Sequence, residues 1–147
     1  MNGRNPEEFL RAFVRPGMTV LEPGPGMGFF SLPLAKLVGP LGRVVAVDIQ
    51  PKMLDNLRRR AAKAGLLSRI ETRLARPDSL AIEDLATRVD FVLAYAVVHE
   101  LPSTETFFRE ASSALKPRGT ARSNSLDLDD LPKMRRNLAA FFTKASA

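Results

Sequence analysis

Apolar and polar residues follow two periodicities along this chain, one typical of strands and one typical of helices. Short runs rich in apolar residues predict strands at residues 18–21, 43–47 and 89–95, and a third strand, between the last two, is predicted at residues 70–74. Apolar residues at helical spacing follow in segments that begin near residues 30, 51 and 103. Strands that alternate with helices are typical of a parallel sheet covered by helices on both faces. We therefore predict an α/β fold with a doubly wound parallel sheet.

Capping residues mark the ends of the predicted helices. Asn5 before Pro6 has the form of an N-cap followed by the first residue of a short helix. Gly39 is expected to end the helix after the first strand. Pro51 opens the next helix, and Gly65 is expected to end it. These boundaries define one complete strand–helix–strand step.

The carboxyl-terminal part departs from this alternation. Residues 120–125 are too polar for a central strand that is buried on both faces. An amphipathic helix is predicted after them, at about residues 131–142. We expect residues 1–147 to form a single domain whose sheet is incomplete at this end. An open sheet edge or exposed apolar surface would need cover, so a homodimer is expected.

Composition excludes several kinds of chemistry. The 147 residues include no Cys and a single His. A disulfide framework, a thiolate metal site, a cysteine nucleophile and a histidine-rich metal cage are therefore excluded. The amino terminus lacks the build of a signal peptide, and no apolar run is long enough to span a membrane. We expect a soluble, cytoplasmic protein with no membrane partner and no metal.

The formal net charge of +6 would suit an anionic partner, because Lys and Arg release counterions when they bind phosphates. The densest cluster, residues 58–60 with Lys63, falls on a predicted helix. An outer helix face in contact with water accounts for the cluster as well. Nucleic acid is therefore kept as an alternative partner that rests on charge alone.

The main candidate for ligand binding is the loop after the first predicted strand, where residues 22–28 read Glu-Pro-Gly-Pro-Gly-Met-Gly. Gly24 and Gly26 allow a tight turn and close approach of the backbone to a ligand, and Gly28 allows the helix to start close to the strand. Asp48, about 20 residues further on at the end of the second strand, can accept hydrogen bonds from both hydroxyls of a ribose. Ligands of open parallel sheets bind at the carboxyl ends of the strands. The pattern therefore predicts a nucleoside cofactor.

The residue types around this loop argue against a dinucleotide. The G-x-G-x-x-G/A fingerprint requires Gly or Ala where this chain has Phe29. Glu22 places a carboxylate beside the loop, which suits a cationic sulfonium and ammonium ligand better than a pyrophosphate. The phosphate-binding pattern G-x-x-x-x-G-K-[ST] does not occur in the sequence.

Residues 20–28 resemble the first motif of the class I S-adenosylmethionine-dependent methyltransferases of the small-molecule type, and residues 90–101 resemble the fourth. The resemblance covers about residues 18–119. It implies a Rossmann-like methyltransferase fold, S-adenosylmethionine as cofactor and S-adenosylhomocysteine as product. It also implies which residues bind each part of the cofactor. The methionine end is expected to contact Glu22, Gly24, Pro25, Gly26 and the carbonyl of Ala94. The ribose is expected to contact Asp48, and the adenine Ile49 and Met53.

The chain departs from this family at two places. After the third strand, relatives often carry Gly-Asp-Ala where residues 75–77 here read Ala-Arg-Pro. Arg76 cannot accept a hydrogen bond from the adenine amino group. Asp78 could take that place, or it could be the N-cap of a following helix, and both interpretations stay open. Arg118 replaces a glycine in the turn after the last family motif.

These features predict transfer of a methyl group to an unidentified acceptor, most simply a small molecule. Such a reaction requires the protein to align donor and acceptor and to exclude water. If the acceptor must lose a proton, His99 is the candidate base, although a histidine that packs or hydrogen-bonds locally is the competing interpretation. The alternative function is a module that binds the cofactor or its product without turnover, or an accessory subunit of an RNA-modifying complex. Arg76 and the polar residues 120–125 favour that alternative.

Overall fold

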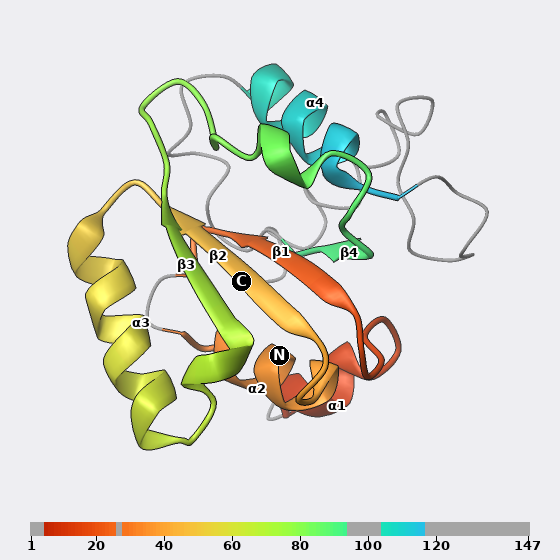
Figure 1. Ribbon diagram of the computed structural model, residues 1–147, viewed down its shortest axis with the longest axis vertical. Coiled ribbons are helices and arrows are strands. Elements are labelled where there is room, and N and C mark those ends of the chain that lie inside the picture. The colour runs from red at the N-terminus through yellow and green to blue at the C-terminus, as the bar shows by residue number, and fades with distance from the viewer. Residues whose placement is uncertain (1–4, 26–27, 94–103, 117–147) are drawn as a thin grey trace.

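The computed structural model describes residues 5–25, 28–93 and 104–116 (Figure 1). Within them, one parallel sheet has the strand order β3-β2-β1-β4. Its strands are β1 (Thr19–Pro23), β2 (Arg43–Asp48), β3 (Ile70–Leu74) and β4 (Phe91–Val92). The chain moves outward from β1 to β3 and then returns to the other side of β1, so the strand order reverses at β1. Doubly wound sheets bind their ligands at such a reversal.

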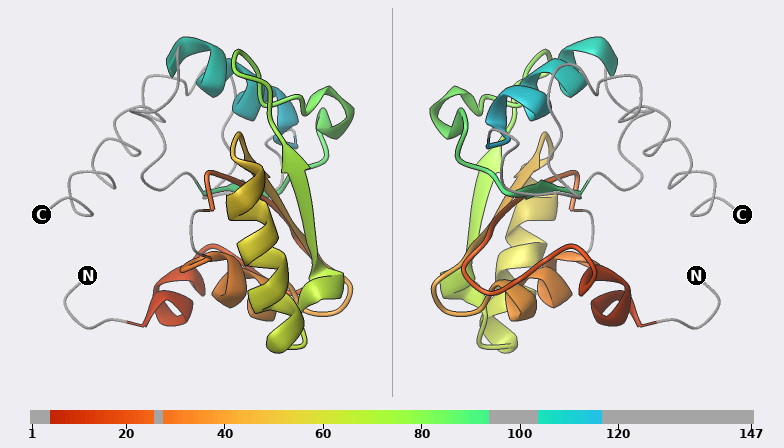
Figure 2. Two further views of the ribbon diagram at one scale, coloured as in Figure 1. Left: turned by 90° about the vertical axis from the view of Figure 1, so that its left-hand side faces the viewer. Right: turned by 90° about the vertical axis from the view of Figure 1, so that its right-hand side faces the viewer.

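Helices cover both faces of this sheet (Figure 2). One face packs against α1, α2 and α3, and the other against α4 and a 3₁₀ turn. The elements are α1 (Pro6–Leu10), α2 (Ser31–Val38), α3 (Pro51–Lys63), α4 (Thr104–Ala114) and the turns Leu67–Arg69 and Glu83–Leu85. The predicted doubly wound α/β fold is therefore confirmed. No helix of the described residues is long and apolar enough to cross a membrane.

The core is divided into two clusters by the alternation of side chains along the central strands. The cluster beneath α1, α2 and α3 includes Val20 of β1 with Val44 and Ala46 of β2. The cluster beneath α4 includes the residues that alternate with them, Leu21 of β1 with Val45 and Val47 of β2. All six are almost completely buried. Burial on both faces explains why these strands are apolar without interruption in the sequence.

The capping residues act as the sequence predicts. The side chain of Asn5 accepts a hydrogen bond of 2.9 Å from the backbone N–H of Glu7, at the start of α1. Gly39 follows α2 with φ 70°. Gly65 lies two residues beyond the end of α3, with φ 74°. Glycine enters this left-handed region without the steric cost of a Cβ atom, so the two helices end where a glycine is available.

Two strand boundaries differ from the prediction. The first strand, expected at 18–21, runs through Glu22 and Pro23, because these residues pair in register with Ala46 and Val47 of β2. The fourth strand, expected at 89–95, is paired as β4 only at Phe91–Val92 within the described residues. The predicted polar segment 120–125 and the helix at 131–142 lie outside the described residues.

Candidate functional site

The carboxyl ends of the four parallel strands lie at one edge of the sheet (Figure 1). Gly24 follows β1, Asp48 ends β2 and Leu74 ends β3. Asp48 and Leu74 are partners in the parallel register of β2 and β3. Gly24, the carboxylate of Asp48 and the apolar Leu74 are far apart in the sequence but lie at the same edge of the sheet.

The glycine loop begins with a backbone shape that only glycine adopts without strain. Gly24 has φ 69°, and its N–H donates a hydrogen bond of 2.7 Å to the carbonyl of Val47 on β2. Gly28, at the other end of the loop, has φ 88°. A Cβ atom added to Gly28 would lie 3.1 Å from Cδ1 of Leu57 on α3. The close neighbour of Gly28 is therefore a helix side chain, rather than the strand that the sequence suggested.

Glu22 lies beneath this loop with its side chain buried at 2% exposure. The hydroxyl of Ser31, the first residue of α2, donates a hydrogen bond of 2.5 Å to Oε1 of Glu22. Burial raises the pKa of the Glu22 carboxyl to about 7, although the hydrogen bond from Ser31 partly offsets the rise. Ser31 was not among the residues that the sequence predicted for the site. A serine that follows the loop directly, at the start of its helix, was the available signal.

Asp48 has the position expected of a ribose-binding carboxylate. Its Oδ1 accepts a hydrogen bond of 2.9 Å from the backbone N–H of Gln50, which fixes the side chain at the end of β2. Its backbone carbonyl accepts a hydrogen bond of 2.9 Å from the N–H of Ala75. Within the described part of the chain, Oδ2 has no hydrogen-bond partner, so one oxygen remains available to a ligand.

Two exposed apolar side chains flank Asp48. Ile49 is 50% exposed and Leu74 is 55% exposed. Met53, in the first turn of α3, is half-buried. Apolar side chains that border a carboxylate in this way suit the flat face of a base next to its ribose. The sequence predicted Ile49 and Met53 but not Leu74, whose only signal was an apolar residue at the end of a strand.

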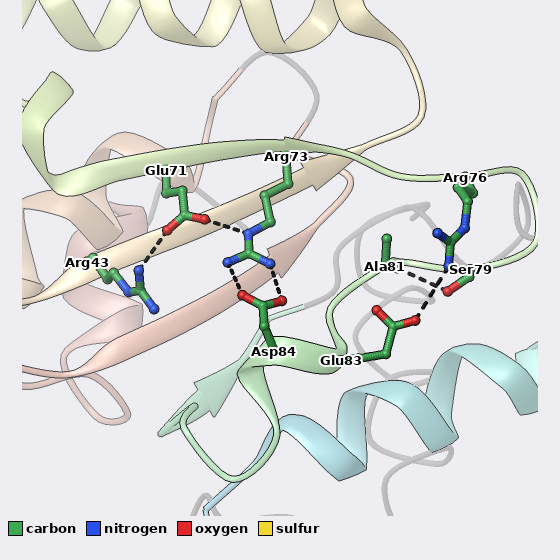
Figure 3. Close-up of polar contacts among 8 residues, drawn as sticks. All are labelled: Arg43, Glu71, Arg73, Arg76, Ser79, Ala81, Glu83 and Asp84. Atoms are coloured by element: carbon green, nitrogen blue, oxygen red, sulfur yellow. Dashed lines mark hydrogen bonds and ion pairs between the residues drawn. The ribbon is translucent and has the colours of Figure 1, made fainter.

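The connection after β3 carries the two predicted residues Arg76 and Asp78. The backbones of Arg76 and Ser79 exchange hydrogen bonds of 2.9 and 3.3 Å across a tight turn, and Asp78 lies exposed within it. The Arg76 guanidinium lies 3.4 Å from the carboxylate of Glu83 (Figure 3). No helix begins at Asp78, since the next element is the 3₁₀ turn at Glu83–Leu85. The N-cap interpretation of Asp78 is therefore wrong, and its adenine-binding role stays a prediction.

Glu110 of α4 holds this turn in place. Its two carboxylate oxygens accept hydrogen bonds from the Ser79 hydroxyl at 2.6 Å and from the Leu80 N–H at 3.2 Å. The Ser79 hydroxyl oxygen in turn accepts a hydrogen bond of 3.0 Å from the N–H of Ala81, which has an unfavourable φ of 56°. This contact could not be predicted from the sequence, because Ser79 and Glu110 are far apart along the chain.

A row of alternating charges ties the same connection to the sheet (Figure 3). Arg73 of β3 makes two hydrogen bonds, of 2.6 and 2.8 Å, to the carboxylate of Asp84. Its Nε donates to Glu71 at 2.5 Å, and Glu71 also accepts from Arg43 of β2 at 2.7 Å. The carboxylates of Asp84 and Glu71 raise the pKa of Arg73 beyond its ordinary range, and the Arg73 guanidinium in turn lowers the pKa of the Asp84 carboxyl. Arg73 therefore remains charged, and the 3₁₀ turn stays attached to β3.

Other predicted residues lie outside the described part of the chain. These are Gly26 of the glycine loop, Ala94 and the candidate base His99. Pro25 is buried next to Gly24, and its carbonyl accepts a hydrogen bond of 3.0 Å from the N–H of Gly28. The roles of Gly26, Ala94 and His99 stay predictions.

Comparison with known proteins identifies the family. Residues 15–145 match the family described as a methyltransferase domain, so the chain belongs to that family. The arsenite methyltransferase of Halobacterium salinarum is 35% identical over 115 residues, which cover 78% of this chain and 28% of that protein. A ubiquinone biosynthesis O-methyltransferase of Methylocella silvestris is 33% identical over 103 residues, covering 70% and 38%. The chain thus spans about a third of the length of these curated relatives.

Among solved structures, a SAM-dependent methyltransferase from Aquifex aeolicus is similar to this chain. The two share 28% identity with a TM-score of 0.69, over 86% of this chain and 71% of the other. The predicted Rossmann-like methyltransferase fold is therefore confirmed, and S-adenosylmethionine is the cofactor of this family.

The described residues fit that cofactor. Gly24 has no Cβ atom and adopts a positive φ where the strand order reverses, which leaves its backbone open to close approach by a ligand. The available carboxylate oxygen of Asp48 suits a ribose hydroxyl, and the exposed apolar side chains of Ile49 and Leu74 suit a base. Each portion of the nucleoside thus has a chemically matched side chain or backbone group at the carboxyl edge.

Proposed function

We propose that this chain is the cofactor-binding domain of a methyltransferase and that it transfers the methyl group of S-adenosylmethionine to a small-molecule acceptor. One observation carries the proposal: Gly24, in its left-handed conformation, lies at the reversal of strand order, and the carboxylate of Asp48 lies at the end of the adjacent strand. A loop of this kind allows a ligand to contact the backbone, while the available carboxylate oxygen of Asp48 suits a ribose hydroxyl.

The chemistry asks little of the protein beyond alignment. When bound, the cofactor supplies an electrophilic methyl carbon attached to a positively charged sulfur. That carbon could accept a lone pair of the acceptor, with the neutral thioether sulfur as the leaving group. Asp48 would orient the ribose, and the apolar side chains of Ile49 and Leu74 would keep water away from the base. We propose His99 as the base for an acceptor that must lose a proton.

The relatives indicate what an acceptor could be. The names of two similar proteins specify arsenite and O-methylation in ubiquinone biosynthesis, whereas two others specify ribosomal protein L11. The first two acceptors are small molecules, which supports the small-molecule proposal. A screen of arsenite and of phenolic compounds, followed by mass spectrometry for an added methyl group, tests it directly.

Calorimetric titration of the full chain tests the cofactor. We expect S-adenosylmethionine and S-adenosylhomocysteine to bind and NADH not to bind. Asp48→Asn keeps an oxygen for the Gln50 N–H but removes the charge, and we expect it to weaken both ligands by about tenfold or more. Glu8→Ala, an exposed acid of α1, is the matched control and should bind both normally. Equal affinities in Asp48→Asn and in the natural sequence would disprove the ribose role.

A second candidate function is a module that binds the cofactor without turnover. The observation that favours it is the arginine at position 76, in the connection where relatives often carry Gly-Asp-Ala. Its side chain forms an ion pair with Glu83. Tight binding of S-adenosylmethionine, with no methylated product from any acceptor in the screen, would support this function.

A nucleic-acid partner has one structural observation in its favour. Four exposed cations of α3 have no acidic partner within the described residues: Lys52, Arg59, Arg60 and Lys63. An accessory subunit of an RNA-modifying complex would use such a surface. An affinity for RNA that falls steeply between low and physiological salt, and that is lost in Arg59→Glu/Arg60→Glu, would support it.

We also propose a cytoplasmic location and a homodimer. The absence of Cys from the sequence agrees with the first, since disulfides are common in secreted domains of small size. Cell fractionation checks the location, and light scattering of the purified chain checks the homodimer.

A further inference from the structure

Two buried polar side chains, the acid Glu22 and the hydroxyl residue Ser31, flank the glycine loop. Glu22 is the fourth residue of β1, and Ser31 is the first residue of α2. Their side chains are 2% and 0% exposed, and the hydroxyl donates to the carboxyl at 2.5 Å. The whole loop lies between these two residues, so the contact fixes where the loop leaves the strand and where it enters the helix.

The surroundings of Glu22 are apolar. It alternates with Leu21 along β1 and therefore points into the layer of α1, α2 and α3, where the buried cluster includes Val20, Phe30 and Ala46. Two causes act on the pKa of its carboxyl, burial and the Ser31 hydroxyl, and no charged side chain of the described residues contributes. Thus no cation of β1, β2, α1, α2 or α3 influences this carboxyl.

The carboxyl group consequently titrates in the physiological range. Its ordinary pKa is 4.5, and burial raises it to about 7. At neutral pH the group is divided between its neutral and charged forms. A positive charge brought close to the loop would favour the charged form, because the apolar surroundings screen the attraction only weakly.

We propose that Glu22 makes the site prefer the positively charged S-adenosylmethionine over its neutral product, by losing a proton when the cofactor binds. The inference rests on the proposed function, since it requires the cofactor to occupy the glycine loop. S-adenosylmethionine carries a sulfonium charge that S-adenosylhomocysteine lacks, and the two are otherwise alike except for one methyl group. A carboxylate beneath the loop therefore distinguishes the two by charge.

The direction of the pH dependence follows from the raised pKa. Below pH 7 the carboxyl of the free protein is mainly protonated and must lose its proton to attract the sulfonium. The Kd of S-adenosylmethionine should therefore fall by up to tenfold per pH unit as the pH rises toward about 7, and then level off. The Kd of S-adenosylhomocysteine should not follow this curve.

Calorimetry of the full chain measures both effects. Both ligands are titrated from about pH 5.5 to about pH 7, below the pKa of about 7.7–8.0 of an α-amino group. Each titration is repeated in two buffers of different ionisation enthalpy, which reports the protons released. We expect up to one proton to be released with S-adenosylmethionine and almost none with S-adenosylhomocysteine. The ratio of the two Kd values should grow by about tenfold over this range.

Two variants separate Glu22 from other titrating groups. Glu22→Gln keeps an acceptor for the Ser31 hydroxyl but cannot ionise, so proton release and the pH dependence of the ratio should disappear, with little change for the product. Ser31→Ala removes the hydrogen bond that lowers the pKa of Glu22, so the curve should move to higher pH. Glu8→Ala, at an exposed position, should leave the curve unchanged.

The outcomes distinguish this inference from the proposed function. Parallel pH curves for the two ligands, or an unchanged curve in Glu22→Gln, would overturn the role of Glu22 and leave cofactor binding intact. Failure of both ligands to bind the folded chain at every pH would overturn the proposed function, and the inference with it.

Discussion

At the scale of single residues, Gly28 shows how the fold constrains the loop. It combines a φ of 88° with a neighbour, Leu57 Cδ1, that an added Cβ atom would approach to 3.1 Å. We predict that Gly28→Ala lowers the free energy of unfolding by about 1–2 kcal/mol for the backbone, and further for the contact. Urea unfolding at constant slope measures the change.

Gly17 provides the matched control for this prediction. It has the same φ of 88°, but no atom lies within 4 Å of the position of its missing Cβ. Gly17→Ala should therefore lose only the backbone contribution. If the two variants were equally stable, the contact between Gly28 and Leu57 would have no energetic role.

The buried carboxyl of Glu22 makes stability depend on pH. Its pKa is about 7 in the folded chain and near 4.5 in the unfolded chain. The folded state therefore holds more protons between these values, and its stability falls as the pH rises through them, by roughly 3 kcal/mol at most. Glu22→Gln should become more stable relative to the natural sequence between about pH 5 and pH 8. Urea unfolding at several pH values checks this, and a constant difference between the two proteins would contradict it.

At the scale of elements, α4 positions the connection after β3 through Glu110. Glu110→Ala would leave the Leu80 N–H and the Ser79 hydroxyl without their acceptor. We predict a loss of about 1–3 kcal/mol and faster hydrogen exchange at Leu80 and Ala81. Arg109→Ala, an exposed position on the same helix, is the control. Unchanged exchange at both amides would show that other contacts hold the turn.

The same elements show what sequence can and cannot predict. β2 extends its predicted bounds by one residue, because a strand buried on both faces leaves a continuous apolar run. β3 has the predicted bounds, although only Ile70 of this outer strand is buried. Gly24 and Asp48 were predicted because each lies at the end of a strand that the sequence itself predicts. Ser79 and Glu110 were not, since their contact joins positions 31 residues apart and leaves no local periodicity. The burial of Glu22 was also missed, because an acid in a loop motif is expected to face water.

At the scale of the whole molecule, the outer edge of the described sheet bears on the predicted homodimer. β3 is the outermost strand on one side, and it carries Glu71 and Arg73 in ion pairs with Arg43 and Asp84. Charged side chains on an edge strand discourage pairing with another sheet. We therefore expect any homodimer of this chain to use a surface other than β3.

A double variant tests the role of these charges. Glu71→Val/Arg73→Val would turn the edge strand into an apolar one, Ile-Val-Thr-Val-Leu, and we predict a mass that increases with protein concentration beyond that of the natural chain. Light scattering after size exclusion measures the mass, with the exposed Arg88→Val as control. An unchanged mass would mean that the geometry of the edge, rather than its charge, prevents association. An increase would mean that the ion pairs that fix the connection near the site also protect the sheet from self-association, so that one row of charges stabilises both.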